Sequence, residues 1–490
     1  MTARLHLHAA VLAMAAALSG CNFAPRYHVP STAPPAPAFK NAPGWVTASP
    51  EDAVAKGEWW HLFGDPALDA LEARVVVTNQ NVIAARAAFD QARALVQQDR
   101  AALFPTISAG AGVTHSKSFG GHSSTFSTNG ALNASGTNYG ASVSGSWAPD
   151  LWSTVTNTVR QANADAQASI GQLANATLSA QGELASDYLQ LRGLDEERQV
   201  LEDSVAADTR DLEVTRNQYR AGTVSLSNVD TAQSALSSDT ASLRDLARQR
   251  AAFEDAIAVL VGADPSRFAI APARWRPSVP EVPGAIPAQV VQRRPDVAAA
   301  ERQVAAANAN IGVQKAAFFP GITLSGSAST DSPTLGNLFS AASSIWSTGA
   351  QVAETLLDFG ARSARVAEAR AAFNSAVADY RETVLTALQQ VEDNLAATRV
   401  YASEADDLDT AASAADHALA IALNDYKAGT VDYTTVATAQ STANAAHLKV
   451  VQLVINRQVS AVSLIEAIGG QWSAAPCPTA QTRLAAKATC

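Results

Sequence analysis

Two long stretches of the chain carry apolar residues at helical spacing and contain no proline. They cover residues 150–264 and 334–475. In the first, large apolar residues recur every three, four or seven positions, which is typical of a helical seam. The members of this seam are Leu184, Tyr188, Leu191, Leu194, Leu201, Val205 and Leu212. A single helix over about residues 152–220 would be ~100 Å long, so it must pack against neighbours along its whole length.

A Tyr-x-Ala-Gly-Thr motif divides each of these stretches, and its two copies begin at Tyr219 and Tyr426. In each copy the glycine suits the left-handed position that ends a helix. A residue that makes a good N-cap follows three positions later. The glycines are Gly222 and Gly429, and the caps are Ser225 and Asp432. The sequence therefore predicts one helical hairpin with a tight tip in each half of the chain.

The hairpins belong to a duplication that covers most of the chain. Residues 219–234 match 426–441 at an offset of 207 (426 − 219), and 82–108 match 297–323 at an offset of 215 (297 − 82). A repeat of more than 200 residues is too long for a solenoid unit. We therefore expect one domain made of two pseudo-equivalent halves. The expected repeats are 51–264 and 265–472.

Between the helices lie segments in which apolar and polar residues alternate, as they do in β-strands. The clearest is 105–114, where every second residue from Ile107 to Val113 is apolar. The others are 139–150, 321–330 and, with poorer alternation, 345–356, and polar loops at 117–138 and 331–344 join them in pairs. This pattern is typical of membrane barrel strands that face lipid on one side and a lumen on the other.

Four strands cannot close a transmembrane barrel, and lipid does not tolerate an open sheet edge. Three copies would supply twelve strands (3 × 4), an even number within the range of known barrels. The sequence therefore predicts an α+β membrane protein. It would be a homotrimer with a twelve-stranded β-barrel that continues into a long α-helical barrel.

The N-terminus has the layout of a bacterial export signal. An apolar run over Ala9–Leu18 ends shortly before Cys21, with small residues between them, as in a lipobox. We interpret residues 1–20 as a signal peptide and 21–50 as a lipidated, proline-rich linker. An ordinary signal peptide with an incidental cysteine is the alternative. The residue after Cys21 is asparagine rather than aspartate, which favours export to the outer membrane.

Two further cysteines, Cys477 and Cys490, lie in a polar C-terminal tail over 473–490. An exported protein folds in an oxidising compartment. A disulfide between these cysteines and a pair of free thiols are both compatible with the sequence, because the sequence alone does not give the geometry of the bond.

Composition narrows the class of function. The net charge is −10 with charges mixed along the chain, which argues against nucleic acid as a partner. The eight histidines are scattered, and the chain contains no HExxH, CxxC, P-loop or GxSxG motif. We therefore expect no enzymatic activity, no metal site and no cofactor. Beyond the signal peptide no apolar run reaches the ~18 residues of a membrane-spanning helix.

Taken together, these features resemble the outer membrane factors, the efflux lipoproteins of the NodT type, which are similar to OprM and more distantly to TolC. The residues that carry the resemblance are Cys21, Pro25, Tyr27, Pro30, Trp59-Trp60, Phe63, Asp65-Pro66, the segment 293–327 and the two Tyr-x-Ala-Gly-Thr tips. The resemblance runs from about residue 18 to 472. It implies a passive, gated duct for small molecules. The duct would be anchored in the outer membrane through Cys21 and would extend into the periplasm.

The resemblance also implies partners. The tips, at Gly222, Thr223, Gly429 and Thr430, would dock on a periplasmic adaptor protein. The adaptor would link the duct to an inner-membrane pump, of the resistance-nodulation-division type. A collar of short elements would surround the helices, drawn from about 51–64, 265–292 and the segment after 470.

The gate of this chain departs from the family pattern. By position the family's gate tyrosine falls on Tyr426, whereas its two charged gate residues fall on Thr438 and Ser441. The charge pairing of relatives is therefore unavailable, and we expect closure by helix packing around Tyr426. Acids near the tips could form an acidic ring or could simply be caps and surface residues. They are Asp230, Asp425 and Asp432.

Two other functions fit part of the sequence. The first is an exit duct for type I protein secretion, which the lipobox and the segment 293–327 disfavour. The second is a periplasmic coiled-coil lipoprotein with a structural role and no channel. That reading explains the helices and the anchor, but it does not explain four alternating segments in the same order in both halves.

Overall fold

The computed structural model describes residues 22–31, 58–117, 135–275, 277–280 and 294–470. The predictions for the signal peptide, for Cys21 and for Cys477 and Cys490 lie outside these residues. The chain forms two compact units. The first comprises Met1–Val29, Asp90–Gln167 and Arg302–Ala378, and the second comprises Pro30–Phe89, Ala168–Glu301 and Asp379–Cys490. Each unit is therefore built from both halves of the duplication.

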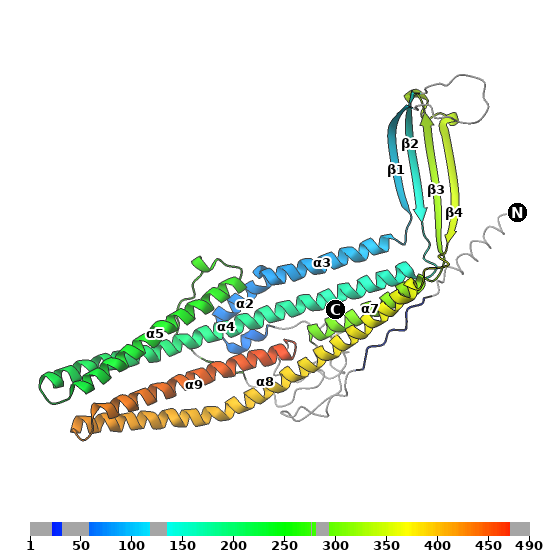
Figure 1. The fold of residues 1–490 in the computed structure, drawn as a ribbon. Coiled ribbons are helices and arrows are strands. Elements are labelled where there is room, and N and C mark those ends of the chain that lie inside the picture. The colour runs from blue at the N-terminus through cyan, green and yellow to red at the C-terminus, as the bar shows by residue number, and fades with distance from the viewer. Residues whose placement is uncertain (1–21, 32–57, 118–134, 276, 281–293, 471–490) are drawn as a thin grey trace, which may run out of the picture. The chain divides into compact units, whose positions relative to one another are not determined.

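All four predicted strands are present in the first unit and form one antiparallel sheet (Figure 1). They pair in the order of the chain, so β1 and β4 are the edges. The strands are β1 (Thr106–Lys117), β2 (Ser135–Trp147), β3 (Gly321–Ser332) and β4 (Ser344–Ala353).

The register of the sheet separates polar from apolar side chains. One row across the four strands consists only of serine: Ser108, Ser144, Ser327 and Ser347. The hydroxyl oxygens of the outer pairs of this row are 2.8 and 2.9 Å apart. A neighbouring row on the opposite face consists of Ala109, Val143, Ala328 and Trp346. The strands therefore form a serine-rich face and an apolar face, as the alternation predicts.

The helices repeat in the order of the duplication. They are α2 (Pro66–Thr78), α3 (Gln80–Ala101), α4 (Thr154–Arg220), α5 (Leu226–Leu260), α7 (Pro295–Ala316), α8 (Ala361–Ala428) and α9 (Tyr433–Ala467). The short 3-10 helices are η1 (Trp59–Phe63), η2 (Pro265–Arg267), η3 (Leu335–Asn337) and η4 (Ala341–Ser343). Helix α7 and strand β3 begin 215 residues after α3 and β1 (295 − 80 and 321 − 106). Helices α8 and α9 begin 207 residues after α4 and α5 (361 − 154 and 433 − 226).

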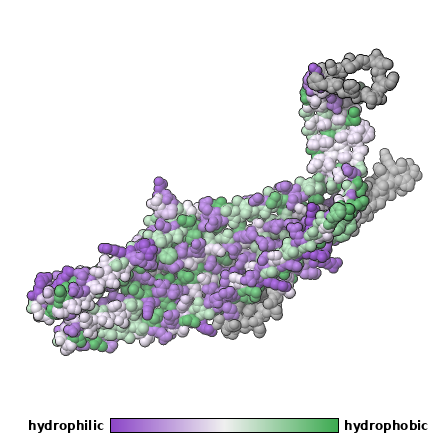
Figure 2. Space-filling model, viewed as in Figure 1, coloured by the Kyte–Doolittle hydropathy of each residue, from purple (hydrophilic) through white to green (hydrophobic). Residues whose placement is uncertain are grey.

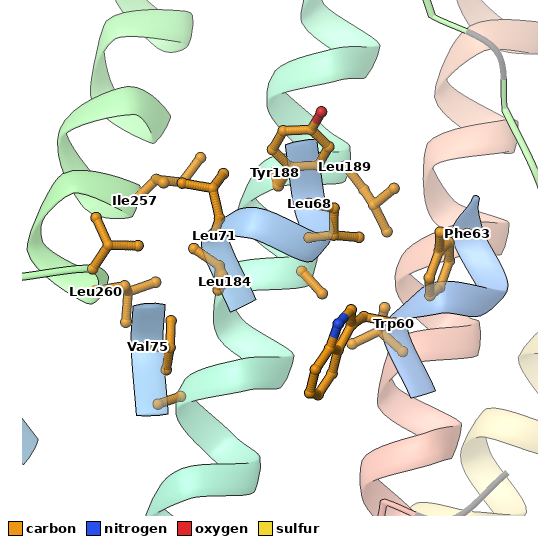
Figure 3. Close-up of a cluster of buried hydrophobic side chains, with 14 of the residues drawn as sticks. Trp60, Phe63, Leu68, Leu71, Val75, Leu184, Tyr188, Leu189, Ile257 and Leu260 are labelled. Atoms are coloured by element: carbon orange, nitrogen blue, oxygen red, sulfur yellow. The ribbon is translucent and has the colours of Figure 1, made fainter. Parts of the chain in front are cut away.

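The main core of the second unit forms where η1 and α2 pack against the long helices (Figure 3). Asp65 caps α2 by accepting hydrogen bonds from Ala67 N and Leu68 N at 2.9 and 3.5 Å. The predicted seam of α4 enters this core through Leu184 and Tyr188, both fully buried. Burial of each large apolar side chain contributes about 1.5–3 kcal/mol. The aromatic residues of η1 therefore stabilise the packing of the long helices.

A buried ion network holds the extended segment that follows η2, part of the expected collar. Asp195 accepts from Arg192 Nη1 at 3.0 Å and from Arg250 Nε at 2.8 Å, and its side chain is 1% exposed. The same two arginines donate to the carbonyl oxygens of Ala271 and Ile270 at 2.9 and 2.6 Å. The network therefore joins α4, α5 and the collar segment.

The second half lacks the acidic members of this network. At the offset of 207, both arginines have arginine counterparts, Arg399 and Arg457. Asp195 corresponds instead to Ala402 (195 + 207), and Glu254, which accepts from Arg250 Nη1 at 3.1 Å, corresponds to Ala461 (254 + 207). The two halves therefore share their backbone but not this buried network.

Helix α9 is long and apolar enough to cross a membrane by length and composition alone, but half of its most apolar window is buried. Ala461, Val462 and Ile465 of this helix lie in the core around η1 and α2. This packing accounts for its composition, so we assign α9 to the helical body. The expectation that no helix of the chain spans the membrane stays a prediction.

Candidate functional site

The two hairpin tips have the same backbone geometry. Gly222 and Gly429 both have a φ of +74°, the left-handed conformation that favours glycine. The next residue, a threonine, closes each turn with its amide and its hydroxyl. Thr223 donates to Gln218 O at 3.0 Å through both groups. Thr430 donates to Asp425 O at 3.0 and 2.9 Å. The motif is thus a helix-ending turn in which threonine supplies a second hydrogen bond.

The N-cap prediction is right in position but wrong in contact. Ser225 and Asp432 occupy the N-caps of α5 and α9, yet neither side chain accepts a capping hydrogen bond. The Ser225 hydroxyl pairs instead with Asn228 Oδ1 at 3.3 Å. The backbone carbonyl of Asp432 accepts from Thr435 N at 3.0 Å, while its side chain is exposed. Because the carboxylate is not used to start the helix, Asp432 is a surface acid at the tip.

Behind the tips the two hairpins share a small apolar cluster. Its buried members are Leu212, Ala232, Ala422, Tyr433 and Val436. The ring of Tyr426 meets the ring of Tyr433 edge to face, with centroids 5.9 Å apart. The Tyr426 hydroxyl donates to Gln218 Oε1 at 2.6 Å. Tyr426 therefore joins α8 to α4, and its expected role in closing a gate stays a prediction.

Acidic side chains lie behind this cluster, further from the tips. Asp208, on α4, is 5% exposed, and its Oδ2 has no hydrogen-bond partner. Burial and the neighbouring Asp239 and Asp211 raise the pKa of Asp208 to about 6. Asp211 is hydrogen-bonded to Tyr433, and Asp239 to Asn444. Both of these contacts reach α9, so acids of the first hairpin hold a helix of the second.

Two grooves between α5 and α9 contain several of the sequence-predicted residues. The groove nearer the tips has a volume of about 630 Å³ and is lined by Asp230, Thr438 and Ser441 among other small polar side chains. The next groove, about 650 Å³, shares Ser441 and is lined by acids of α4 and α5. These acids are Glu197, Asp208, Asp239 and Asp245. Among the described lining residues of both grooves there is no lysine or arginine.

The structure therefore brings together three of the six gate candidates, Asp230, Thr438 and Ser441. Tyr426 lies in the apolar cluster, and Asp425 and Asp432 lie outside both grooves. Sequence reasoning missed Gln218, Tyr433 and Asp208. A signal for Gln218 was available, because it is the repeat counterpart of Asp425 (425 − 207). No group of metal-ligating side chains close enough to hold an ion occurs within the described ranges.

A family model described as "Outer membrane efflux protein" matches residues 73–263 and 286–470. The chain belongs to this family. Its two matched ranges correspond to the two halves of the duplication. Among similar proteins, the probable efflux pump outer membrane protein TtgC of Pseudomonas putida is 27% identical over 93% of this chain and 93% of the relative. The pyoverdine export outer membrane protein OpmQ of Pseudomonas aeruginosa is 28% identical over 87% of this chain and 90% of the relative.

Solved channels share the fold. The CmeC outer membrane channel of Campylobacter jejuni aligns over 96% of this chain and 98% of its own, with a TM-score of 0.82 and 18% identity. The outer-membrane channel OprN aligns over 92% of this chain and 100% of its own, with a TM-score of 0.80 and 24% identity. The chain has the fold of these outer-membrane channels, so the predicted fold of the chain, four antiparallel strands and long helices in two repeated halves, is confirmed. The chain is an outer-membrane channel of an efflux system and not an enzyme.

Proposed function

We propose that three copies of this chain form a passive duct that carries small molecules across the outer membrane. A periplasmic adaptor and an inner-membrane pump of the resistance-nodulation-division type would feed it. The observation that carries the proposal is the sheet. The outer sides of its edge strands, β1 and β4, have no strand partner among the described residues. One face of the sheet is apolar and the other is rich in serine. Such a sheet is stable in lipid only when copies pair edge to edge around a polar lumen.

The anchor proposed at Cys21 is supported by the residues that follow it. Phe23 stacks on Phe319, next to the start of β3, with ring centroids 4.3 Å apart. Asn157 Nδ2 donates to Asn22 Oδ1 at 3.0 Å, and Asn308 Nδ2 donates to Pro25 O at 2.9 Å. These contacts hold the chain immediately after the cysteine near the end of the sheet, where an acyl group could enter the same membrane.

The proposed docking surface for the adaptor consists of the tips at Gly222, Thr223, Gly429 and Thr430. Their backbones are alike, so one partner motif could recognise both hairpins. The related proteins act in the efflux of toluene and of antibiotics and in the export of pyoverdine. These are different small molecules, which supports a duct that is permissive while the pump selects.

Channel recordings would test the proposal directly. The lipidated protein, purified in detergent, should run as a trimer that dissociates on heating, and it should conduct ions in planar bilayers. Replacing Gly222 and Gly429 with alanine should weaken adaptor capture but leave the trimer and its conductance in place. A folded monomer that does not conduct would contradict the proposal and would favour the structural coiled-coil reading.

A further inference from the structure

Among the aromatic side chains where the strands meet the helices, four are related in pairs by the duplication, and the members of only one of these pairs contact each other. Trp152 stacks on Phe319, with ring centroids 4.9 Å apart and an interplanar angle of 25°. Phe104 and Phe359 have no ring contact among the described residues and are 68% and 92% exposed. Figure 2 shows hydrophobic residues gathered at this end of the sheet.

The two exposed rings are the repeat counterparts of the stacked pair. Phe359 follows Trp152 by 207 residues (359 − 152), the offset that relates α8 to α4. Phe104 precedes Phe319 by 215 residues (319 − 104), the offset that relates β1 to β3. The duplication therefore supplies two equivalent aromatic pairs, of which one is satisfied within the chain.

The stacked pair continues the register of the central strands. Pairing of β2 with β3 ends at Trp147 opposite Leu324, and each ring lies five residues beyond that point (152 − 147 and 324 − 319). Within each hairpin, Ser146 pairs with Thr106 and Ala353 pairs with Gly321, so β4 is equivalent to β2 at the offset of 207.

The same offsets predict how β4 would pair with β1. The pair Ser146–Ser325 becomes Ala353–Gly110 (146 + 207 and 325 − 215), and Trp152–Phe319 becomes Phe359–Phe104. Since β1 and β4 are opposite edges of one sheet, they can meet only between two copies of the chain.

We propose that Phe359 stacks on Phe104 of the partner subunit and seals each β4–β1 seam at the end where the strands meet the helices. The contact rests on the trimeric barrel of the proposed function. It would also cover Leu356 and Leu357, which are 90% and 71% exposed in the single chain. Aromatic pairs of this kind add specificity beyond the apolar area that they bury.

Cysteine crosslinking would test the contact in outer membranes, in a chain that carries Cys477→Ser and Cys490→Ser. Phe104→Cys with Phe359→Cys should give covalent trimers without reductant. Trp152→Cys with Phe319→Cys should crosslink within one chain and leave monomers. A second intersubunit pair, Ser116→Cys with Ser347→Cys, follows from the same offsets applied to Gly140–Asp331 (140 + 207 and 331 − 215) and reports closure of the barrel independently.

The outcomes separate the two levels of the proposal. If the serine-derived pair crosslinks and the phenylalanine-derived pair does not, the stack is overturned while the trimer stands. If neither pair crosslinks, the proposed trimeric barrel fails in this register. As a second measurement, Phe104→Ala and Phe359→Ala should each lower the temperature at which the trimer dissociates, and the double variant should be no worse than the poorer single one. Additive losses would indicate that each ring contacts lipid instead.

Discussion

Tyr426 donates a hydrogen bond of 2.6 Å to Gln218 and so ties the second hairpin to the first just behind the tips. The two residues are 208 positions apart in the chain, and the bond is part-buried. It involves none of the positions at which relatives are expected to carry gate charges. The hypothesis that helix packing around Tyr426 closes the mouth of this chain therefore rests on a neutral contact between helices.

Removing this contact should loosen the closed mouth. Tyr426→Phe removes a net hydrogen bond worth about 0.5–1.5 kcal/mol, so single-channel conductance should rise modestly. Tyr426→Ala also removes the ring that meets Tyr433 and should raise it further. Tyr219→Phe is the matched control, because this repeat counterpart is 44% exposed. Unchanged conductance in both Tyr426 variants would reject the packing gate.

The stability of the contact between hairpins should fall as pH rises from about 4 to about 6. The folded protein holds the pKa of Asp208 at about 6, above the unfolded value of ~3.9, so it binds more protons than the unfolded chain in this window. Below the window Asp208 is protonated in both states, and above it the penalty for the buried charge is fully present.

Asp208→Asn should therefore raise the unfolding temperature at pH 7.5 and shrink the difference between pH 5 and pH 7.5. Circular dichroism melts of the detergent-solubilised protein would measure both. Asp245→Asn is the control, because Arg248 and Gln249 hold the pKa of the exposed Asp245 below its usual value. An equal flattening in the control variant would mean that Asp208 is not the responsible group.

The tips should not tolerate a side chain at their glycines. Gly222→Ala and Gly429→Ala each place a Cβ at a φ of +74°, which costs roughly 1–2 kcal/mol. No heavy atom lies within 4 Å of the added carbon, so the cost is conformational and not a clash. We expect weaker adaptor capture in a pull-down, with Asn milder than Ala. Gly336→Ala, also in open space but without a positive φ, should have no effect.

Asp195 should be the most sensitive single residue of the collar network. Asp195→Ala leaves the guanidinium groups of Arg192 and Arg250 without their shared carboxylate, and breaking a buried ion pair in this way costs about 3–5 kcal/mol. The unfolding temperature should drop accordingly, with protease cleavage appearing in the collar segment near Ala271. Asp203→Ala, on an exposed position of the same helix, should leave both measurements unchanged.

Local patterns predicted the elements well. Alternation located three strands, and the poorly alternating candidate at 345–356 overlaps β4. Proline after Asp65 located the start of α2. Gly222 and Gly429 predicted the left-handed turns, because the φ of such a turn depends on the local backbone and not on distant contacts. The duplication then extended each prediction to the other half.

Contacts between the hairpins could not be predicted in the same way. Gln218 and Asp208 have their roles only because α8 and α9 lie against them. How the helices are placed side by side does not follow from the local sequence of any one helix. The predicted capping hydrogen bond of Asp432 is absent, although the residue type favours it, because the side chain points to solvent instead of to the helix backbone. The partners of Asp195 include Ala273 N, whose position depends on the path of the collar segment.

The unequal charge network of the two halves has a mechanical consequence. Asp195 and Glu254 are part of the network that joins α4 and α5 to the collar segment. The equivalent residues of α8 and α9 are Ala402 and Ala461. The collar segment is held on α9 by a neutral bond instead, from Gln458 Nε2 to Ser278 O at 2.9 Å. We therefore expect the contact of the second hairpin with this segment to break before the charge-paired contact of α4 and α5.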